Sequence, residues 1–132
     1  MPPVTDSWRL VQSLADTLTP SEPDQFATRE SASDWLHDAG LLPADAGLSN
    51  SEHNALLRLR DALRDVRAAR STGRADPDAA ARLTRALADG RIVVTLGEDG
   101  TVTLASSARS VYPNAVAAIA IAIANSAAGG VF

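Results

Sequence analysis

The sequence contains no cysteine and no lysine among its 132 residues, and only five of them are aromatic. Without cysteine the chain has no disulfide, no cysteine-ligated zinc site, no iron–sulfur cluster and no thiol nucleophile. All twelve basic residues are arginine, which codon use in a GC-rich genome explains most simply. The composition therefore removes several chemistries and leaves a chain rich in helix-forming residues.

Long apolar runs are also missing. The longest run covers residues 115–124, about half of the roughly 20 residues that a membrane-spanning helix needs. The first residues, MPPVTD, lack the basic segment and apolar stretch of a signal peptide. We therefore expect a cytoplasmic protein that makes no membrane contact.

The chain is short of positive charge, with a formal net charge of −4. Proteins that bind nucleic acid usually present a basic patch to the phosphates. Because this chain is acidic overall, we expect no direct nucleic-acid contact from this segment. Its 26 alanines favour helices and let them approach closely, although each buries little area. The length predicts a single domain over residues 1–132, with a core at about residues 7–128.

Apolar residues at helical spacing predict five helices, at about residues 7–18, 32–39, 50–71, 77–89 and 113–127. Asp6 is the expected N-cap of the first helix and Pro20 its stop. Gly40 follows the second, where a left-handed residue is favoured. The fifth is apolar nearly all round, so we expect it at the centre of the fold.

The third and fourth helices have the clearest local signals. Ser49 and Glu52 have the spacing of a capping box, and an apolar stripe follows them at Leu56, Leu59, Leu63 and Val66. Asp76 and Pro77 have the order of an N-cap and a first-turn proline. Gly90 is the expected end of the fourth helix.

The period changes to two over residues 92–96 and 101–104, which predicts a β-hairpin around a loop at residues 97–100. Two strands alone are marginally stable, so we expect the apolar face of this hairpin to cover the helices. The predicted fold class is α+β, mostly α, with about five helices packed with one antiparallel β-hairpin.

Motifs for catalysis or for metal and cofactor binding are absent. The two histidines, His37 and His53, have no partner at metal-ligand spacing, and we expect both to be exposed on helices. No GxSxG, P-loop or GxGxxG occurs. We therefore predict no catalytic residue, no metal, no cofactor and no enzyme.

Three arginines of the third predicted helix, Arg60, Arg64 and Arg67, fall in one sector of the helical wheel beside the leucine stripe. Like charges at this spacing repel each other unless something anionic meets them. One interpretation is a small anionic ligand or an acidic partner. The other is a set of salt bridges to aspartates of neighbouring helices, and the spacing leaves both open.

Three stretches point to a known family. Residues 10–18 read LVQSLADTL, residues 35–42 read WLHDAGLL and residues 59–64 read LRDALR. They resemble the opening helix, the tryptophan–leucine to glycine–leucine segment and the arginine-bearing helix of the ABATE domain. That domain is the N-terminal part of the CGNR zinc-finger family, and the likeness covers about residues 8–128. It implies a bacterial transcription regulator that responds to stress.

The chain departs from this pattern in two places. Ser13 stands where the family usually has aspartate and Asp16 where it has asparagine, while Thr17 is retained. The C-terminal zinc finger with its Cys-Gly-Asn-Arg signature is missing. Because the chain ends close to where the finger would begin, we expect either a domain separated from its finger or a member that has lost it.

The resemblance and the wheel positions together predict a sensor domain that binds a small ligand between the first and third helices. The candidate binding residues are polar, cationic and aromatic: Ser13, Asp16, Thr17, Trp35, Arg60, Arg64 and Arg67. One alternative is an interaction module in which the fifth helix and residues 126–132 form a homodimer. A second alternative is a small enzyme that uses Asp16 with an arginine.

Overall fold

The computed structural model describes residues 3–106 and 110–128, and of residues 3–6 and 128 it describes the backbone alone. This part of the chain forms five α-helices, one 3-10 helix and one antiparallel pair of strands, which confirms the predicted mostly helical α+β class. In chain order the elements are α1 (Pro3–Ala15), α2 (Arg29–Asp38), α3 (Asn50–Ser71), α4 (Pro77–Leu87), η1 (Ala88–Gly90), β1 (Ile92–Leu96), β2 (Val102–Ser106) and α5 (Val111–Ala128).

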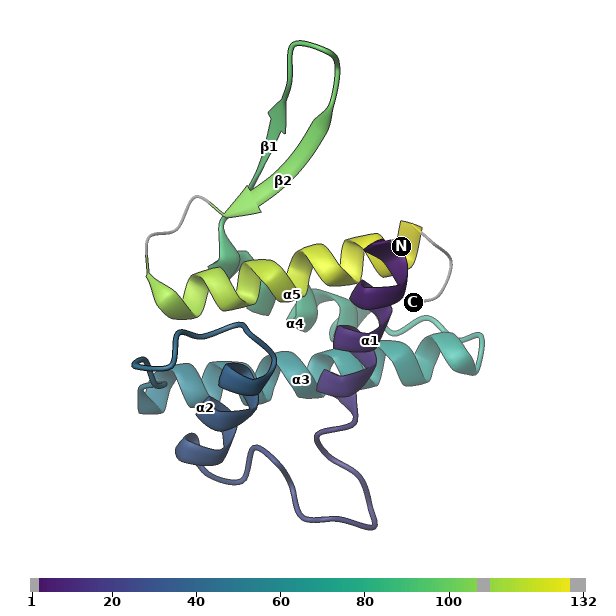
Figure 1. Ribbon diagram of the computed structural model, residues 1–132. Coiled ribbons are helices and arrows are strands. Elements are labelled where there is room, and N and C mark those ends of the chain that lie inside the picture. Colours follow the sequence, from purple (N-terminus) through teal and green to yellow (C-terminus); the bar gives the residue numbers. More distant parts are fainter. Residues whose placement is uncertain (1–2, 107–109, 129–132) are drawn as a thin grey trace.

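The helices pack around one apolar core (Figure 1). The α1 helix packs chiefly on α5, and α4 packs along α3. Side chains from all five helices close the core, among them Leu14, Leu36, Leu59, Leu83 and Ile119. The α5 helix contacts α1, α4, η1 and β2, in keeping with its predicted central place. Most of its buried residues lie on one side, and Asn114, Ala124 and Ala127 are exposed.

The local signals for α3 and α4 are confirmed in detail. The Ser49 Oγ accepts a hydrogen bond from the Glu52 amide at 3.1 Å, and the Glu52 carboxylate accepts one from the Ser49 amide at 2.8 Å. The Asp76 carboxylate accepts from the Ala79 amide at 3.0 Å. These contacts pair backbone donors that a helix start leaves without partners.

The predicted limits of α1 are wrong at both ends. The helix begins at Pro3, so Asp6 lies within it and is not its N-cap. It ends at Ala15, well before Pro20. The physical reason for the early end is the Arg64 side chain of α3, which donates to carbonyl groups at this terminus.

Other limits shift by a few residues. The α2 helix begins at Arg29 because Thr28 forms a capping box that was not predicted. The α4 helix ends at Leu87, and η1 carries the chain on to Gly90. That glycine lies close to α5, since a Cβ placed on it would be 2.8 Å from the Ala117 nitrogen.

The predicted β-hairpin forms, with its second strand at Val102–Ser106 in place of residues 101–104, but it does not cover the helices. The strands pair in the register Val94↔Leu104 and Leu96↔Val102, and the hairpin projects away from the helical body (Figure 1). Its base contacts α5, and the Ser106 hydroxyl donates to the Gly90 carbonyl at 2.7 Å. The expectation that its apolar face is buried on the helices is therefore wrong.

The two histidines are half-buried, which corrects the expectation that both are exposed. The His53 imidazole bonds the Phe26 carbonyl at 2.8 Å, and the His37 imidazole bonds the carbonyl of Ala46. Within residues 3–106 and 110–128, no three potential metal ligands cluster together. No helix in the same ranges is long and apolar enough to cross a membrane.

Candidate functional site

Arg60, one of the predicted ligand-binding residues, is buried and paired inside the protein. Its guanidinium holds both carboxylate oxygens of Asp24, at 2.6 and 3.2 Å, and its Nε donates to Asp61 at 3.2 Å. The guanidinium carbon also lies 5.2 Å from the centre of the Phe26 ring, within the range of a cation–π contact. The charge of Arg60 is therefore paired with carboxylates of the protein itself.

Asp24 is held ionised by this contact. Burial raises the pKa of the Asp24 carboxyl, but the hydrogen bonds from the Arg60 guanidinium and the Phe26 amide outweigh burial and set the pKa below its usual value. The amide bond is 2.8 Å long. Asp24 lies in the loop after α1, so the pair ties this loop to α3.

Arg64 and Thr17 complete the end of α1. One Arg64 nitrogen, Nη1, donates to the carbonyls of Ala15 at 2.6 Å and Leu18 at 2.5 Å. The Thr17 hydroxyl is buried and donates to the Leu14 carbonyl at 2.8 Å. A cation at a helix C-terminus also interacts favourably with the helix dipole, so both side chains act on the fold at this position.

Trp35 forms part of the packing around the same loop. Its ring meets the Phe26 ring edge-on, with centroids 5.5 Å apart and an angle of 77°. Phe26 is fully buried, and Trp35 is half-buried against the core. Trp35, Arg60, Arg64 and Thr17 thus belong to one structural cluster that anchors the segment after α1.

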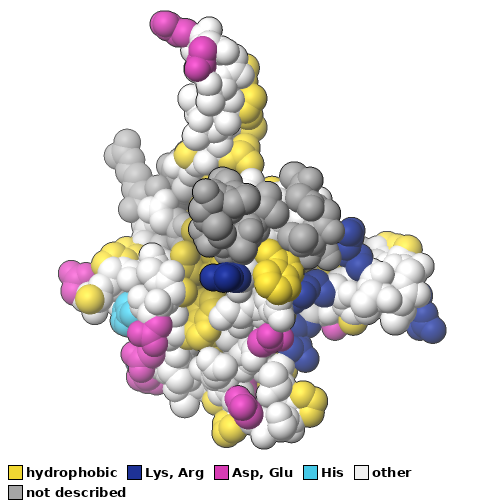
Figure 2. All heavy atoms as spheres, turned by 45° about the vertical axis from the view of Figure 1, so that its right-hand side comes forward, with side chains coloured by type: hydrophobic (Ala, Val, Ile, Leu, Met, Phe, Trp, Pro, Cys, Tyr) yellow, Lys and Arg dark blue, Asp and Glu magenta, His cyan; other side chains and the backbone are white. Residues whose placement is uncertain are grey.

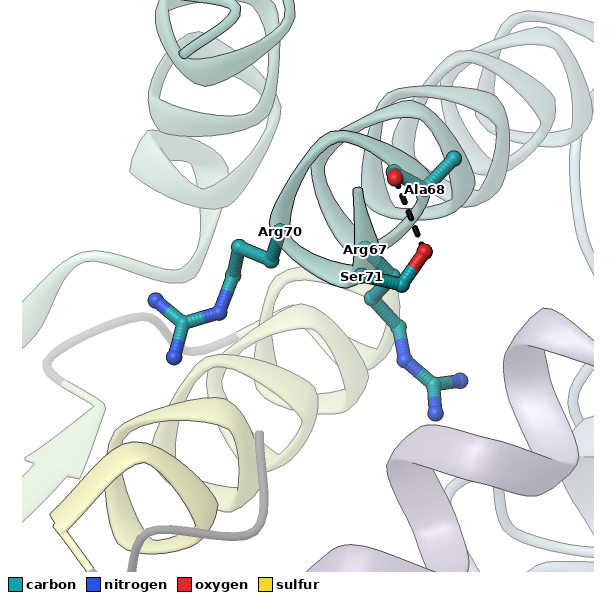
Figure 3. Close-up of a pocket in the computed structure, with 4 residues that line it drawn as sticks. All are labelled: Arg67, Ala68, Arg70 and Ser71. Carbon is teal, nitrogen blue, oxygen red and sulfur yellow. Dashed lines mark hydrogen bonds between the residues drawn. The ribbon is translucent and has the colours of Figure 1, made fainter. Parts of the chain in front are cut away.

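Arg67 lies apart from this cluster. It lines a surface hollow of about 630 Å³ at the C-terminal end of α3, together with Ala68, Arg70 and Ser71. Figure 3 shows the Arg67 and Arg70 side chains leaving the helix in different directions, beside the 2.9 Å hydrogen bond from the Ser71 hydroxyl to the Ala68 carbonyl. In the described ranges, the guanidinium of Arg67 makes no ion pair or hydrogen bond.

Ser13 and Asp16 instead meet at a second hollow, of about 430 Å³, on the outer face of α1. The other lining residues are Trp8, Arg9, Gln12 and Gln25. Ser13 and Asp16 are both exposed, and the Asp16 amide still bonds the Gln12 carbonyl at 2.9 Å. This bond keeps Asp16 on the helix face that Ser13 and Gln12 share.

The hollow on α1 offers both charges and an aromatic surface. Arg9 provides a cation and Asp16 an anion, separated along the helix by about 10 Å at 1.5 Å per residue. The Gln12 Oε1 is shielded from solvent and accepts no hydrogen bond from the described residues. Trp8 is 36 % exposed beside these polar groups. The arrangement can hydrogen-bond a small polar molecule and stack an apolar part of it.

Four of the lining residues, Trp8, Arg9, Gln12 and Gln25, are absent from the candidates predicted from sequence. A usable signal exists for two of them. Arg9 and Gln12 precede Ser13 and Asp16 by helical spacings of three or four residues, so all four share one helix face. The helical spacing of Trp8 to Val11 and Ala15 predicts a place on the buried face. Gln25 reaches the hollow because the loop folds back, with the Gln25 amide donating to the Thr17 carbonyl at 2.9 Å.

One comparison with known proteins finds a match. A family model named ABATE, with the description "Putative stress-induced transcription regulator", matches residues 8–130. No curated protein matches the chain, and no solved structure does.

Proposed function

The chain belongs to the ABATE family, and from this premise we propose that it is the ligand-sensing part of a stress-response transcription regulator. The proposed binding site is the hollow on α1 that contains Ser13 and Asp16. The site thus differs from the predicted one between α1 and α3, where Arg60 and Arg64 bind the protein's own acceptors.

The observation that supports this proposal most is the grouping of the Arg9 cation, the Asp16 carboxylate and the partly exposed Trp8 ring around one hollow. A ligand that carries both charges can pair with Arg9 and with Asp16, and a hydrogen bond to a charged group contributes about 1.5–3 kcal/mol. The exposed Ser13 hydroxyl lines the same hollow and offers a further polar contact.

The charges of the hollow define the ligand class. Arg9 favours a carboxylate or phosphate, and Asp16 favours an ammonium or a hydroxyl donor. Because Trp8 adds a partly exposed indole, we propose a small zwitterionic metabolite with an apolar side group, such as an amino acid. The negative net charge of the chain leaves DNA contact to another part of the regulator, such as the zinc finger of the family.

The test uses the two tryptophans as reporters. The purified chain is titrated with a panel of amino acids, dicarboxylates and inorganic phosphate, and the two indole N–H signals are followed by NMR. A Trp8→Phe variant assigns the signals. We expect a zwitterionic ligand to shift the signal of Trp8 and to leave that of Trp35, which is packed on Phe26, nearly unchanged.

Three variants separate the proposed site from its neighbours. Arg9→Met and Asp16→Asn remove one charge each, and we expect either change to weaken binding about tenfold, the loss of one charged hydrogen bond. Arg67→Met is the matched control, since Arg67 lines the other hollow. A ligand that binds all three variants as tightly as the original chain contradicts the proposed site, as does a panel that never shifts Trp8.

A further inference from the structure

The two-stranded hairpin leaves an apolar surface uncovered. Three residues that share one face by register, Val94, Leu96 and Val102, are 63 %, 69 % and 61 % exposed. Figure 2 shows hydrophobic side chains in a strip along one side of the hairpin, and acidic side chains at its tip. Three large apolar side chains on one face of the hairpin are therefore left in contact with water.

A hairpin of two strands needs a cover. Both strands are edges, and an isolated pair is marginally stable in water. Among the described residues, this hairpin contacts the helical body through β2 and α5 and through the hydrogen bond from Ser106 to the Gly90 carbonyl. The strands nevertheless keep a regular register over five residue pairs. A partner on the apolar face would remove the exposed strip and hold the hairpin in this form.

We propose that the partner is a second copy of this chain, bound through the same apolar face with the two hairpins antiparallel. A two-fold axis between the faces makes the contact self-complementary, because each copy supplies and receives the same side chains. In this arrangement Val94, in the middle of β1, lies opposite Val94 of the other copy. Leu96 near one tip then lies opposite the base of the other hairpin.

The charges at the two ends of the hairpin favour the antiparallel direction. Glu98 and Asp99 lie in the loop at the tip, and Arg91 directly precedes β1 at the base. Parallel hairpins would bring four carboxylates together, whereas antiparallel hairpins bring each acidic tip towards the basic end of the other. The Asp99 carboxylate is ionised at neutral pH at its ordinary pKa, and hydrogen bonds from the Thr101 hydroxyl and amide lower that pKa further.

The size of the face sets the expected strength. Five residues per strand and two strands give a face about 17 Å long and about 10 Å wide. Two such faces fall below the roughly 1,200 Å² of a standard stable interface. We therefore expect a weak dimer that dissociates on dilution, with a dissociation constant in the range of about 10 µM to 1 mM.

Sedimentation velocity over this concentration range tests the proposal. We expect the original chain to shift from monomer to dimer as its concentration rises. Replacing Val94 and Leu96 together by threonine keeps strand propensity and should weaken the dimer at least tenfold. Val93→Thr on the opposite face is the matched control and should leave the dimer unchanged. Circular dichroism of each variant checks that the fold is kept.

Two results overturn the proposal: a chain that stays monomeric at about 1 mM, and a dimer that the double variant leaves intact. The second result would favour the alternative interface on α5 and the chain end.

Single cysteines test the direction of the hairpins, since the chain has no cysteine of its own. We expect Val94→Cys to be joined into a dimer by a short bis-maleimide and Thr103→Cys, on the opposite face, not to be. Preferential joining of Leu96→Cys indicates parallel hairpins and overturns the proposed arrangement.

Discussion

Replacing Asp24 by asparagine tests whether the buried ion pair with Arg60 holds the loop after α1 in place. The Arg60 side chain is only 3 % exposed, and Asp24 binds it through two oxygens. Asparagine keeps the size of the side chain and an oxygen for the Phe26 amide, but removes the negative charge. The guanidinium then stays buried with Asp61 as its remaining carboxylate.

The size of the effect follows from these contacts. Breaking a buried pair by removing one partner costs about 3–5 kcal/mol. The Asp24 side chain is 27 % exposed, and Asp61 still lies 3.2 Å from the Arg60 Nε. Water and a second carboxylate therefore reduce the loss in the free energy of unfolding. We expect Asp24→Asn to lower the free energy of unfolding by about 2–3 kcal/mol, and Tm by about 6–12 °C.

The assay is urea unfolding of four proteins: the original chain, Asp24→Asn, Arg60→Met and the double variant. The double variant should lose less than the sum of the single losses, because either change alone removes the interaction. Asp78→Asn is the matched control, since it removes one carboxylate of the exposed pair with Arg82. Exposed pairs contribute little, so its unfolding should match that of the original chain.

The pH dependence gives a second check of the same pair. The pKa of Asp24 is lowered in the folded protein, so its contribution is present above the unfolded pKa of about 3.9. It is lost as the pH falls through the folded value. The difference in the free energy of unfolding between the original chain and Asp24→Asn should therefore become smaller below about pH 4. Equal losses in Asp24→Asn and Asp78→Asn, or a difference that stays constant down to acid pH, would refute the reasoning.

Three further predictions concern single contacts. Arg64→Met removes the donor at the end of α1 and should cost about 1.5–3 kcal/mol, with faster amide hydrogen exchange in the last turn of α1; unchanged exchange contradicts the capping role. Gly90→Ala places a Cβ 2.8 Å from the Ala117 backbone and should lower stability by about 1–3 kcal/mol, whereas a neutral change in thermal unfolding would mean that α5 shifts easily. Burial raises the pKa of Tyr112, the sole tyrosine, so absorbance near 295 nm should show no phenolate at about pH 10 while the protein stays folded. The stability from this protonated phenol is present below the unfolded pKa and is lost as the pH rises above it.

Elements with local signals could be predicted from sequence. The limits of α3 and its capping box at Ser49 and Glu52 are confirmed, as is the glycine after α2, since Gly40 has a φ of 76°. The residues that interact at these positions lie within a few places of each other in the chain. A helix cap or a tight turn can therefore be predicted from a short stretch of sequence.

The candidate site could be predicted only in part. Ser13 and Asp16 do line one hollow, because helical spacing alone puts them on one face. Arg60 and Arg64 lie on one face of α3 as the helical wheel predicts, but the wheel does not say what that face meets. Asp24 is 36 residues before Arg60, and no local pattern joins the two.

The sequence by itself determined the five α-helices, the N-caps of α3 and α4, and the alternation that makes a hairpin. The tertiary structure decided where α1 ends, which acceptors Arg60 and Arg64 bind, and that the hairpin stands away from the helices. The physical reason is the separation along the sequence of the residues that interact. Backbone hydrogen bonds and caps join near neighbours, whereas ion pairs and packing join segments that only the folded chain brings together.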